Sequence, residues 1–175
     1  VDYFIYARNS LLLSGSAAIV AVLIGLFLAY ALRLHNNPAL KIATRLANVG
    51  YAMPGAVLAI GVLIPFARFD NAVDAVMRES FGISTGLMLS GTVVAIVFAY
   101  SVRFLTVGMG GVETALLKVT PHMDDAARTL GEKPMGVLRR VHLPMIKSGL
   151  LGGGILVFVD GMKELPATLI LRPFN

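Results

Sequence analysis

The sequence has no cysteine and few charged residues. The lack of cysteine excludes disulfides, thiolate metal sites and cysteine nucleophiles, and it leaves the redox compartment open. Charged residues make up only 14% of the chain, whereas 57% of its residues are hydrophobic. With a mean hydropathy of +0.79, the chain is more apolar than water-soluble domains normally are. The composition therefore predicts a membrane protein.

Several signatures of catalytic and ligand-binding sites are also missing. The chain has no G-x-x-x-x-G-K-[ST] loop for nucleotide phosphates and no nucleophile elbow. Its glycine clusters, 110–111 and 152–154, follow no predicted strand, so we expect close helix packing there. The histidines lack an i,i+4 partner, which predicts surface residues rather than metal ligands; they are His35, His122 and His142. We therefore expect no enzyme active site, bound cofactor or metal in this chain.

The chain is basic, with a net charge of +5 and a pI of about 9.8. Such a balance can indicate a nucleic-acid partner. Here, however, the basic residues are scattered between apolar blocks and are not interleaved with aromatic residues. The membrane interpretation takes precedence, and we expect contact with membrane lipid and no nucleic-acid partner.

Apolar blocks of about 20 residues, the length that crosses a bilayer, recur along the chain. The predicted spans are residues 11–32, 46–67, 87–107 and 148–171. We therefore predict an all-α, polytopic transmembrane helical bundle in which residues 1–175 form a single domain. Small residues at 14–18 predict close approach of another helix. In the second span, Met53-Pro54-Gly55 predicts a kink or a late helix start, because proline removes a backbone donor.

Positive charge is concentrated in two of the segments between spans, 33–45 and 108–147. Because an excess of Lys and Arg marks cytoplasmic loops, both segments are predicted to face the cytoplasm. Segment 66–86, which has more acids than bases, is predicted to lie outside. Arg103 lies close to the inner end of the third span, where we expect its side chain to reach the lipid headgroups as an anchor.

The loop at 108–147 is punctuated like a pair of short helices. Thr120 as a cap and Pro121 at the first position predict a helix start, and Gly131 predicts the left-handed turn that ends this helix. Pro134 predicts a second helix start. Pro144 predicts a turn into the fourth span.

The first of these short helices is predicted to be amphipathic. Its apolar stripe consists of Met123, Ala126, Ala127 and Leu130. Asp124 and Arg128 form an i,i+4 pair on the opposite side. A helix of roughly ten residues is marginal in isolation, so it must lie against a partner. From the residues alone, docking into another protein and resting on the membrane surface remain equal alternatives.

The loop also carries a specific pattern: an acid followed by two alanines, three residues, a glycine, nine residues and then V-x-L-P. The residues are Asp125, Ala126, Ala127, Gly131, Val141, Leu143 and Pro144. This pattern resembles the EAA loop of binding-protein-dependent ABC importer permeases, in which glutamate stands at the first position and isoleucine at the position of Val141. In that family the loop forms the coupling helix that docks into a cleft of the ATP-binding subunit. The resemblance implies that these residues dock an ATPase.

Other segments extend the resemblance over nearly the whole chain. Residues 9–13 and 52–55 resemble the opening elements of the same MetI-like membrane domain. Residues 157–169 and 171–175 are similar to the second half of ferric-iron importer permeases, which are often two fused halves. The resemblance implies a multi-pass protein of the cell inner membrane that imports iron(III). It also implies a periplasmic iron-binding protein, two copies of an ATPase that uses ATP, and a second permease half.

The first residue is Val1, and no basic, cleavable leader follows it. We therefore expect a fragment of a longer polypeptide. The resemblance to ferric-iron permeases implies that the missing parts are the first permease half and the closing helix of the second half.

The fourth predicted span contains the charged residues Asp160, Lys163 and Glu164. On a helix they share one face and can neutralise one another. Ionisable groups in a span usually face an aqueous path, and carboxylates suit a hard cation such as iron(III). They are our tentative substrate-pathway residues, and a structural ion pair near the outer mouth remains the alternative.

Three other functions stay open at this level. The first is the same importer type with another cargo, such as sulfate, molybdate, thiamine or a polyamine, for which the tail from Lys163 is the discriminating segment. The second is a nucleotide-independent channel or secondary carrier, with the charged fourth span as its site. The third is a membrane scaffold without transport. Dependence of transport on an ATPase distinguishes an importer from a channel or secondary carrier.

Overall fold

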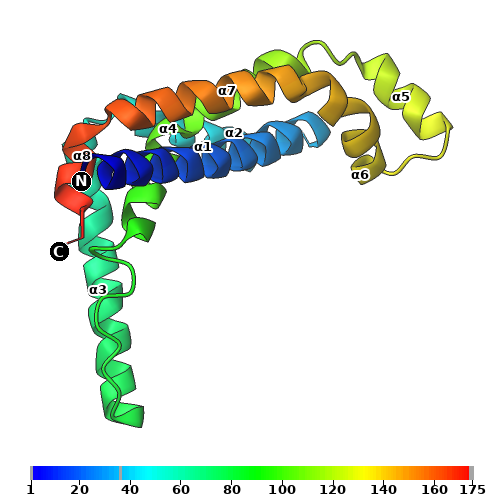
Figure 1. Cartoon of the computed structure of the whole chain (residues 1–175). Coiled ribbons are helices and arrows are strands. Elements are labelled where there is room, and N and C mark those ends of the chain that lie inside the picture. The colour runs from blue at the N-terminus through cyan, green and yellow to red at the C-terminus, as the bar shows by residue number, and fades with distance from the viewer. Residues whose placement is uncertain (1, 36, 174–175) are drawn as a thin grey trace.

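The computed structural model describes residues 2–35 and 37–173, and every regular element in those ranges is a helix (Figure 1). In chain order the elements are α1 (Asp2–Leu34), α2 (Pro38–Ala52), α3 (Gly55–Phe81), α4 (Val93–Leu116), α5 (Pro121–Thr129), α6 (Pro134–Val137), the π-helical turn η1 (Leu138–His142), α7 (Leu143–Lys163) and α8 (Leu165–Leu171). The predicted all-α fold class is confirmed. The parts of the sequence interpretation that involve Val1, Asn36 and residues 174–175 lie outside the described residues.

Four helical stretches are long and apolar enough to cross a membrane. They are Tyr3–Leu34, Gly55–Phe81, Val93–Leu116 and Pro134–Lys163. The protein is therefore an integral, multi-pass membrane protein. The boundaries differ from the predicted spans: α4 begins at Val93, where the Thr92 hydroxyl accepts from Val94 N–H at 3.3 Å, and continues to Leu116. The predicted span 87–107 thus starts too early and ends too soon.

The core of the molecule is a bundle in which α1, α4 and α7 lie side by side, with α2 along α4 (Figure 1). Small residues allow the close approach. A Cβ added to Gly111 would lie 2.9 Å from Gly153 Cα, and one added to Gly161 would lie 3.2 Å from the Ser14 hydroxyl. Lipid supplies no hydrophobic drive between helices, so such van der Waals contacts hold the bundle together. The expected packing role of the small residues is confirmed.

The second predicted span is interrupted at Met53 and Pro54. α2 ends at Ala52, Pro54 has extended backbone (φ −57°, ψ 136°), and α3 begins at Gly55. From there α3 points away from the bundle (Figure 1). The predicted late helix start is confirmed. A second interruption, at Glu164 (φ −81°, ψ 90°), separates α7 from α8 within the fourth predicted span.

Two aspartates of α3 hold the irregular segment 82–92 that returns the chain to α4. Asp74 Oδ1 accepts from Thr85 N–H at 2.8 Å, and fully buried Asp70 accepts from Ser90 N–H at 2.7 Å. α3 runs to Phe81 and stops where Gly82 takes φ +68°. The polar loop predicted at 66–86 is therefore largely helical, because its charged residues lie on α3 rather than in a turn.

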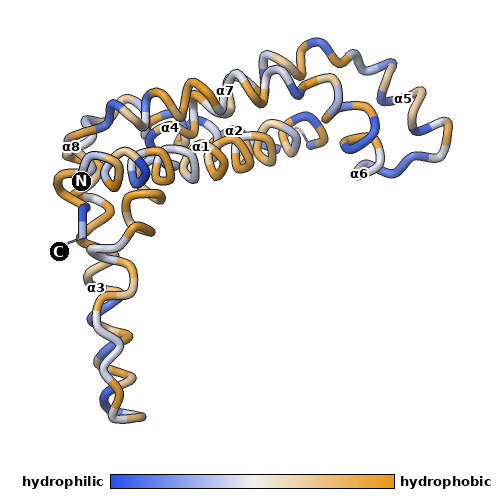
Figure 2. Tube along the Cα trace, viewed as in Figure 1, coloured by the Kyte–Doolittle hydropathy of each residue, from blue (hydrophilic) through white to orange (hydrophobic). Residues whose placement is uncertain are grey.

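The two basic segments meet at one end of the bundle. The turn between α1 and α2 lies at the same end as α5 and α6, whereas α8 lies at the other end (Figure 1). Figure 2 shows hydrophilic residues gathered around α5 and α6 and apolar residues along most of the bundle. The polar parts of 33–45 and 108–147 therefore share one end, which agrees with their predicted placement on one side of the membrane.

We expect Gly111→Ala to lower the melting temperature of the detergent-solubilised protein. The added Cβ would lie 2.8 Å from the Gly149 carbonyl oxygen, and overpacking of this kind costs about 1–3 kcal/mol. Gly110→Ala is the matched control, because a Cβ there has nothing within 4 Å and alanine favours a helix. Equal melting temperatures for the two variants would contradict the close packing of α4 on α7.

Candidate functional site

The segment that connects α4 to α7 contains the short helix α5. Pro121 occupies its first turn, as predicted. The Thr120 side chain makes no capping hydrogen bond; instead, the Thr120 carbonyl accepts from Met123 N–H at 3.1 Å, so the predicted side-chain cap is wrong. Gly131 has φ +86°, which is the left-handed conformation that ends the helix. The predicted start and stop of this helix are confirmed.

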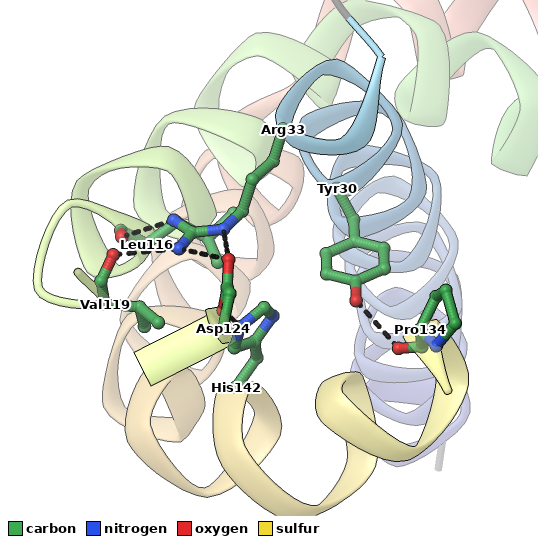
Figure 3. A network of polar contacts seen from close by, with 7 residues as sticks. All are labelled: Tyr30, Arg33, Leu116, Val119, Asp124, Pro134 and His142. Carbon is green, nitrogen blue, oxygen red and sulfur yellow. Dashed lines mark hydrogen bonds and ion pairs between the residues drawn. The ribbon is translucent and has the colours of Figure 1, made fainter. Parts of the chain in front are cut away.

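Asp124 anchors α5 to the bundle (Figure 3). Arg33, at the end of α1, donates from Nη2 to Asp124 Oδ2 at 2.9 Å and from Nε to the same oxygen at 3.2 Å. Arg33 also donates to the carbonyls of Leu116 and Val119, at 3.3 and 2.9 Å. The other carboxylate oxygen lies 2.5 Å from His142 Nε2. One carboxylate and one guanidinium thus join α1, the end of α4, α5 and η1.

The charge of Asp124 is maintained by its partners. Burial raises the pKa of the Asp124 carboxyl, but hydrogen bonds from His142 and Arg33 outweigh burial and hold this pKa below its ordinary value. At neutral pH the group is a carboxylate and can only accept hydrogen bonds. The ion pairs of Asp124 among the described residues are those with Arg33 and His142, so the predicted i,i+4 pair with Arg128 is not formed.

His142 is a buried member of this network. Its side chain is 1% exposed, so the expectation of a surface histidine is wrong at this position. With Asp124 ionised, His142 Nε2 is the donor, and Nδ1 has no partner among the described residues. The imidazole packs edge-on against Tyr30 with ring centroids 5.4 Å apart. The Tyr30 hydroxyl donates to the Pro134 carbonyl at 2.9 Å, which ties α6 to α1 as well.

The residues of the EAA-like pattern are divided between covered and uncovered positions. The exposed ones are Asp125, Ala126, Gly131 and Pro144. The buried or half-buried ones are Ala127, Val141 and Leu143. The pattern therefore contributes both a packed base and an open face.

The predicted apolar stripe of α5 is mostly uncovered. Ala127 is buried at 7% exposure, whereas Met123 is 38% and Leu130 is 85% exposed. Burial of Ala127 and the contacts of Asp124 with Arg33 and His142 attach the helix to the rest of the chain. The remaining apolar side chains face away from the described part of the chain.

An unbroken helical rod of 30 residues, Pro134–Lys163, joins this loop to the bundle and bends between α6 and α7 (Figure 1). It consists of α6, η1 and α7, so Pro144 lies inside a helix and not in the predicted turn. A proline inside a helix clashes with the carbonyl four residues earlier. Here the wider π-helical turn Leu138–His142 comes directly before Pro144, and such turns occur frequently at functional sites.

The charged residues of the fourth predicted span do not neutralise one another. Glu164 ends α7 and pairs with Arg103 of α4, with Nε 3.0 Å from Oε2. Lys163 is exposed, and Asp160 is half-buried with no ion pair within residues 2–35 and 37–173. Arg103 lies near the middle of α4, because that helix extends to Leu116. The prediction of Arg103 as a headgroup anchor is wrong.

No cluster of three or more histidine, aspartate or glutamate side chains suited to holding a metal ion occurs in the part of the chain that the structure describes. Asp160 and Glu164 are thus not joined by a third ligand of these types. Their place in a substrate pathway remains a prediction.

The membrane bundle and its EAA-patterned loop define a class of protein, the membrane permease of an ABC importer. Residues 21–172 match the family described as "Binding-protein-dependent transport system inner membrane component". The chain belongs to this family, and the predicted MetI-like resemblance is confirmed.

Named relatives differ in the cargo that their names give. The chain is 27% identical over 163 residues to an Fe(3+)-transport system permease protein of Haemophilus influenzae, covering 93% of this chain and 29% of that protein. It is 24% identical over 164 residues to a protein of Salmonella typhimurium named as a 2-aminoethylphosphonate transport system permease, covering 94% and 56%. It is 31% identical over 168 residues to a protein of Haloferax volcanii named as a molybdenum ABC transporter permease, covering 94% and 58%. The chain thus spans less than two thirds of each relative.

Sequence reasoning did not find the partners of Asp124. In the sequence Arg33 is noticed only as one of the positive charges of its segment, and no residue near Tyr30 or His142 in the chain indicates that they belong to a site. Their contacts with the loop join residues up to 104 positions apart. A lone arginine at the end of a span, facing a loop that contains acids, is the one signal that points to such a contact.

We expect Asp124→Asn to loosen α5, because Arg33 and buried His142 lose their charged partner. Hydrogen bonds to charged groups contribute about 1.5–3 kcal/mol. Trypsin cleavage at exposed Arg128 should become faster, and so should amide exchange in α5. Asp125→Asn is the matched control, because Asp125 is exposed on the same helix. If both variants are cleaved at the wild-type rate, Asp124 does not anchor the loop.

Proposed function

We propose that this chain is a permease part of a binding-protein-dependent ABC importer of the cell inner membrane, with α5 as the coupling helix that docks into an ATPase. The observation that carries the proposal is the way α5 is held. Asp124 fixes one side of the helix through Arg33 and His142, while Met123 on the helix and Leu130 at its C-cap stay exposed. A short helix that is held firmly yet uncovered suits a cleft on another protein better than a resting place on lipid.

The same contacts provide the route of coupling. Movement of the ATPase cleft displaces α5 as a rigid body. Asp124 passes this displacement to α1 through Arg33, and to the Pro134–Lys163 rod through His142. The helices that line the membrane pathway then shift together and change the side on which it is open. ATP is bound and hydrolysed on two partner ATPase subunits, and this chain acts only as the transport subunit.

The other partners follow from the family. Its description as binding-protein-dependent supports a periplasmic binding protein that delivers the cargo. A second permease half, either fused or homologous, completes the pathway around this bundle. In this proposal the cytoplasmic loop of the single domain 1–175 is the segment 117–142 between α4 and α7, which is shorter than the predicted 108–147 because α4 extends to Leu116.

The proposed cargo is iron(III). The resemblance of residues 157–169 to ferric-iron permeases supports it, as does the named cargo of the Haemophilus influenzae relative. Of the residues proposed for the pathway, Asp160 is the carboxylate without an ion-pair partner among those described, and Glu164 is engaged by Arg103. Lys163 lies exposed beside them. The relatives named for molybdenum and for a phosphonate favour an oxyanion as the alternative cargo.

We expect Ala126→Trp to abolish ATPase stimulation by the loaded binding protein in the reconstituted complex. Ala126 is exposed on α5, so a bulky side chain there blocks docking without disturbing the fold. Lys147→Trp, at an exposed position on α7, is the control. Full stimulation in Ala126→Trp would refute docking through this face.

We expect proteoliposomes that hold the complete permease, ATPase and binding protein to take up labelled iron(III) only with ATP. Molybdate, sulfate, 2-aminoethylphosphonate, thiamine and polyamines are tested as competitors. Asp160→Asn should reduce iron uptake, because iron(III) prefers carboxylate oxygens, and Asp160→Glu, which keeps the carboxylate, is its control. ATP-driven uptake of another compound alone would assign that cargo instead, and uptake without ATP would indicate a channel or secondary carrier.

A further inference from the structure

Two helix interruptions meet at the end of the bundle opposite α5. α2 ends before Met53 and α3 starts at Gly55, while α7 ends before Glu164 and α8 follows it. Figure 1 shows α8 beside the start of α3. A Cβ added to Gly55 would overlap the Glu164 carboxylate. The two broken helices are therefore in direct contact at their breaks.

Arg103 of α4 binds both interruptions at once. Its Nη1 donates to the Met53 carbonyl, which the end of α2 leaves without an intrahelical donor. Its Nε lies 3.0 Å from Glu164 Oε2, with side-chain exposures of 19% for Arg103 and 9% for Glu164. This second contact is an ion pair without a hydrogen bond at Nε. The guanidinium thus bridges α2–α3 and α7–α8.

The backbone of Glu164 is fixed independently of its charge. Its carbonyl accepts from the Tyr100 hydroxyl at 2.8 Å and from the Thr168 hydroxyl at 2.5 Å. Its Oε1 accepts from Ala167 N–H at 3.4 Å and caps α8. The helix break would therefore persist without Arg103, and the ion pair adds a contact between separate elements.

Charged groups inside a membrane protein are costly and commonly functional. Removing one partner of a buried pair leaves the other charge uncompensated. A pair between separate elements also has two discrete states, formed and broken, as a switching contact requires. Glu164 sits at the far end of the rod whose near end carries His142 and the Asp124 contact. A displacement that begins at α5 consequently reaches Glu164 along one helix.

We infer that Arg103 and Glu164 form a latch, which holds the start of α3 against α8 and keeps the end of the bundle away from α5 closed. Opening of this end requires the ion pair to break. Arg103 is then a positioning residue for transport. The inference rests on the proposed importer function, because it assigns the latch to the side of the membrane opposite the ATPase.

The absence of cysteine from the chain allows single-cysteine reporters of opening. Ala59→Cys places a thiol on α3 at a position with 0% exposure, in the same apolar cluster as Ala167 of α8. Ala29→Cys places one at 5% exposure in the other cluster, toward the α5 end. Maleimide labelling of each reporter is measured in the complete, nucleotide-free complex, with and without Glu164→Gln.

With Glu164→Gln we expect labelling at Ala59→Cys to rise about tenfold or more, with no change at Ala29→Cys. The double variant Arg103→Gln/Glu164→Gln leaves no unpaired buried charge, so it guards against misfolding, and it should show the same rise. Unchanged labelling at Ala59→Cys in both variants would overturn the latch. An equal rise at both reporters would also overturn it, because that result indicates general loosening.

Measurements of transport distinguish failure of the latch inference from failure of the importer proposal on which it rests. In the wild-type complex, ATP and loaded binding protein should raise labelling at Ala59→Cys, and in the latch variants labelling should be high without them. The variants should also hydrolyse several-fold more ATP for each cargo molecule imported. Absence of ATP-dependent uptake in the wild type refutes the importer proposal, whereas the nucleotide-free labelling still decides whether the pair closes this end. If the variants hydrolyse as much ATP for each imported cargo molecule as the wild type does, the Arg103–Glu164 pair has no role in transport.

Discussion

A helix that ends in or beside a membrane leaves carbonyl groups that neither lipid nor an intrahelical donor satisfies. In this protein two arginines meet that requirement. Arg33 donates to the Val119 carbonyl just beyond the end of α4 and shares the Leu116 carbonyl with Val119 N–H, and Arg103 donates to the Met53 carbonyl, where α2 ends. A cation is also favoured at this pole of the helix dipole. Each guanidinium then holds one carboxylate, so the same chemistry organises both ends of the bundle.

Much of the fold follows from the sequence, because membrane helices are marked by local composition. Apolar length, proline at 54 and small residues at helix contacts are readable one segment at a time. The EAA-like pattern is likewise contained in one loop. The pairing of Arg33 with Asp124 and of Arg103 with Glu164 is not readable in this way, because each joins residues that lie far apart in the chain. The prediction for Arg103 was wrong because the third span was predicted to end at residue 107, whereas α4 extends to Leu116. The prediction for Pro144 was wrong because no residue near it in the sequence indicates the π-helical turn that precedes it.

The two ends of the bundle differ in how far they specify function. The loop end carries the EAA-like pattern, which resembles that of ABC importer permeases, and its anchoring contacts explain why an exposed short helix keeps its shape. The other end contains the charged residues from which a cargo could be read, yet one carboxylate there is already paired within the chain. Relatives with similar sequences carry names with iron, molybdenum and phosphonate. The family is therefore more readily recognised from this chain than the cargo is.

The π-helical turn has a geometric consequence for the rod that it interrupts. Val137 and His142 are both buried, at 3% and 1% exposure, although they are five residues apart. An α-helix would turn residues at that spacing to different sides, since its period is about 3.6 residues. From His142 onward the buried face continues with the ordinary spacing to Ile146. The π-helical turn thus accommodates one extra residue, so that Val137 before it and His142 at its end can both be buried.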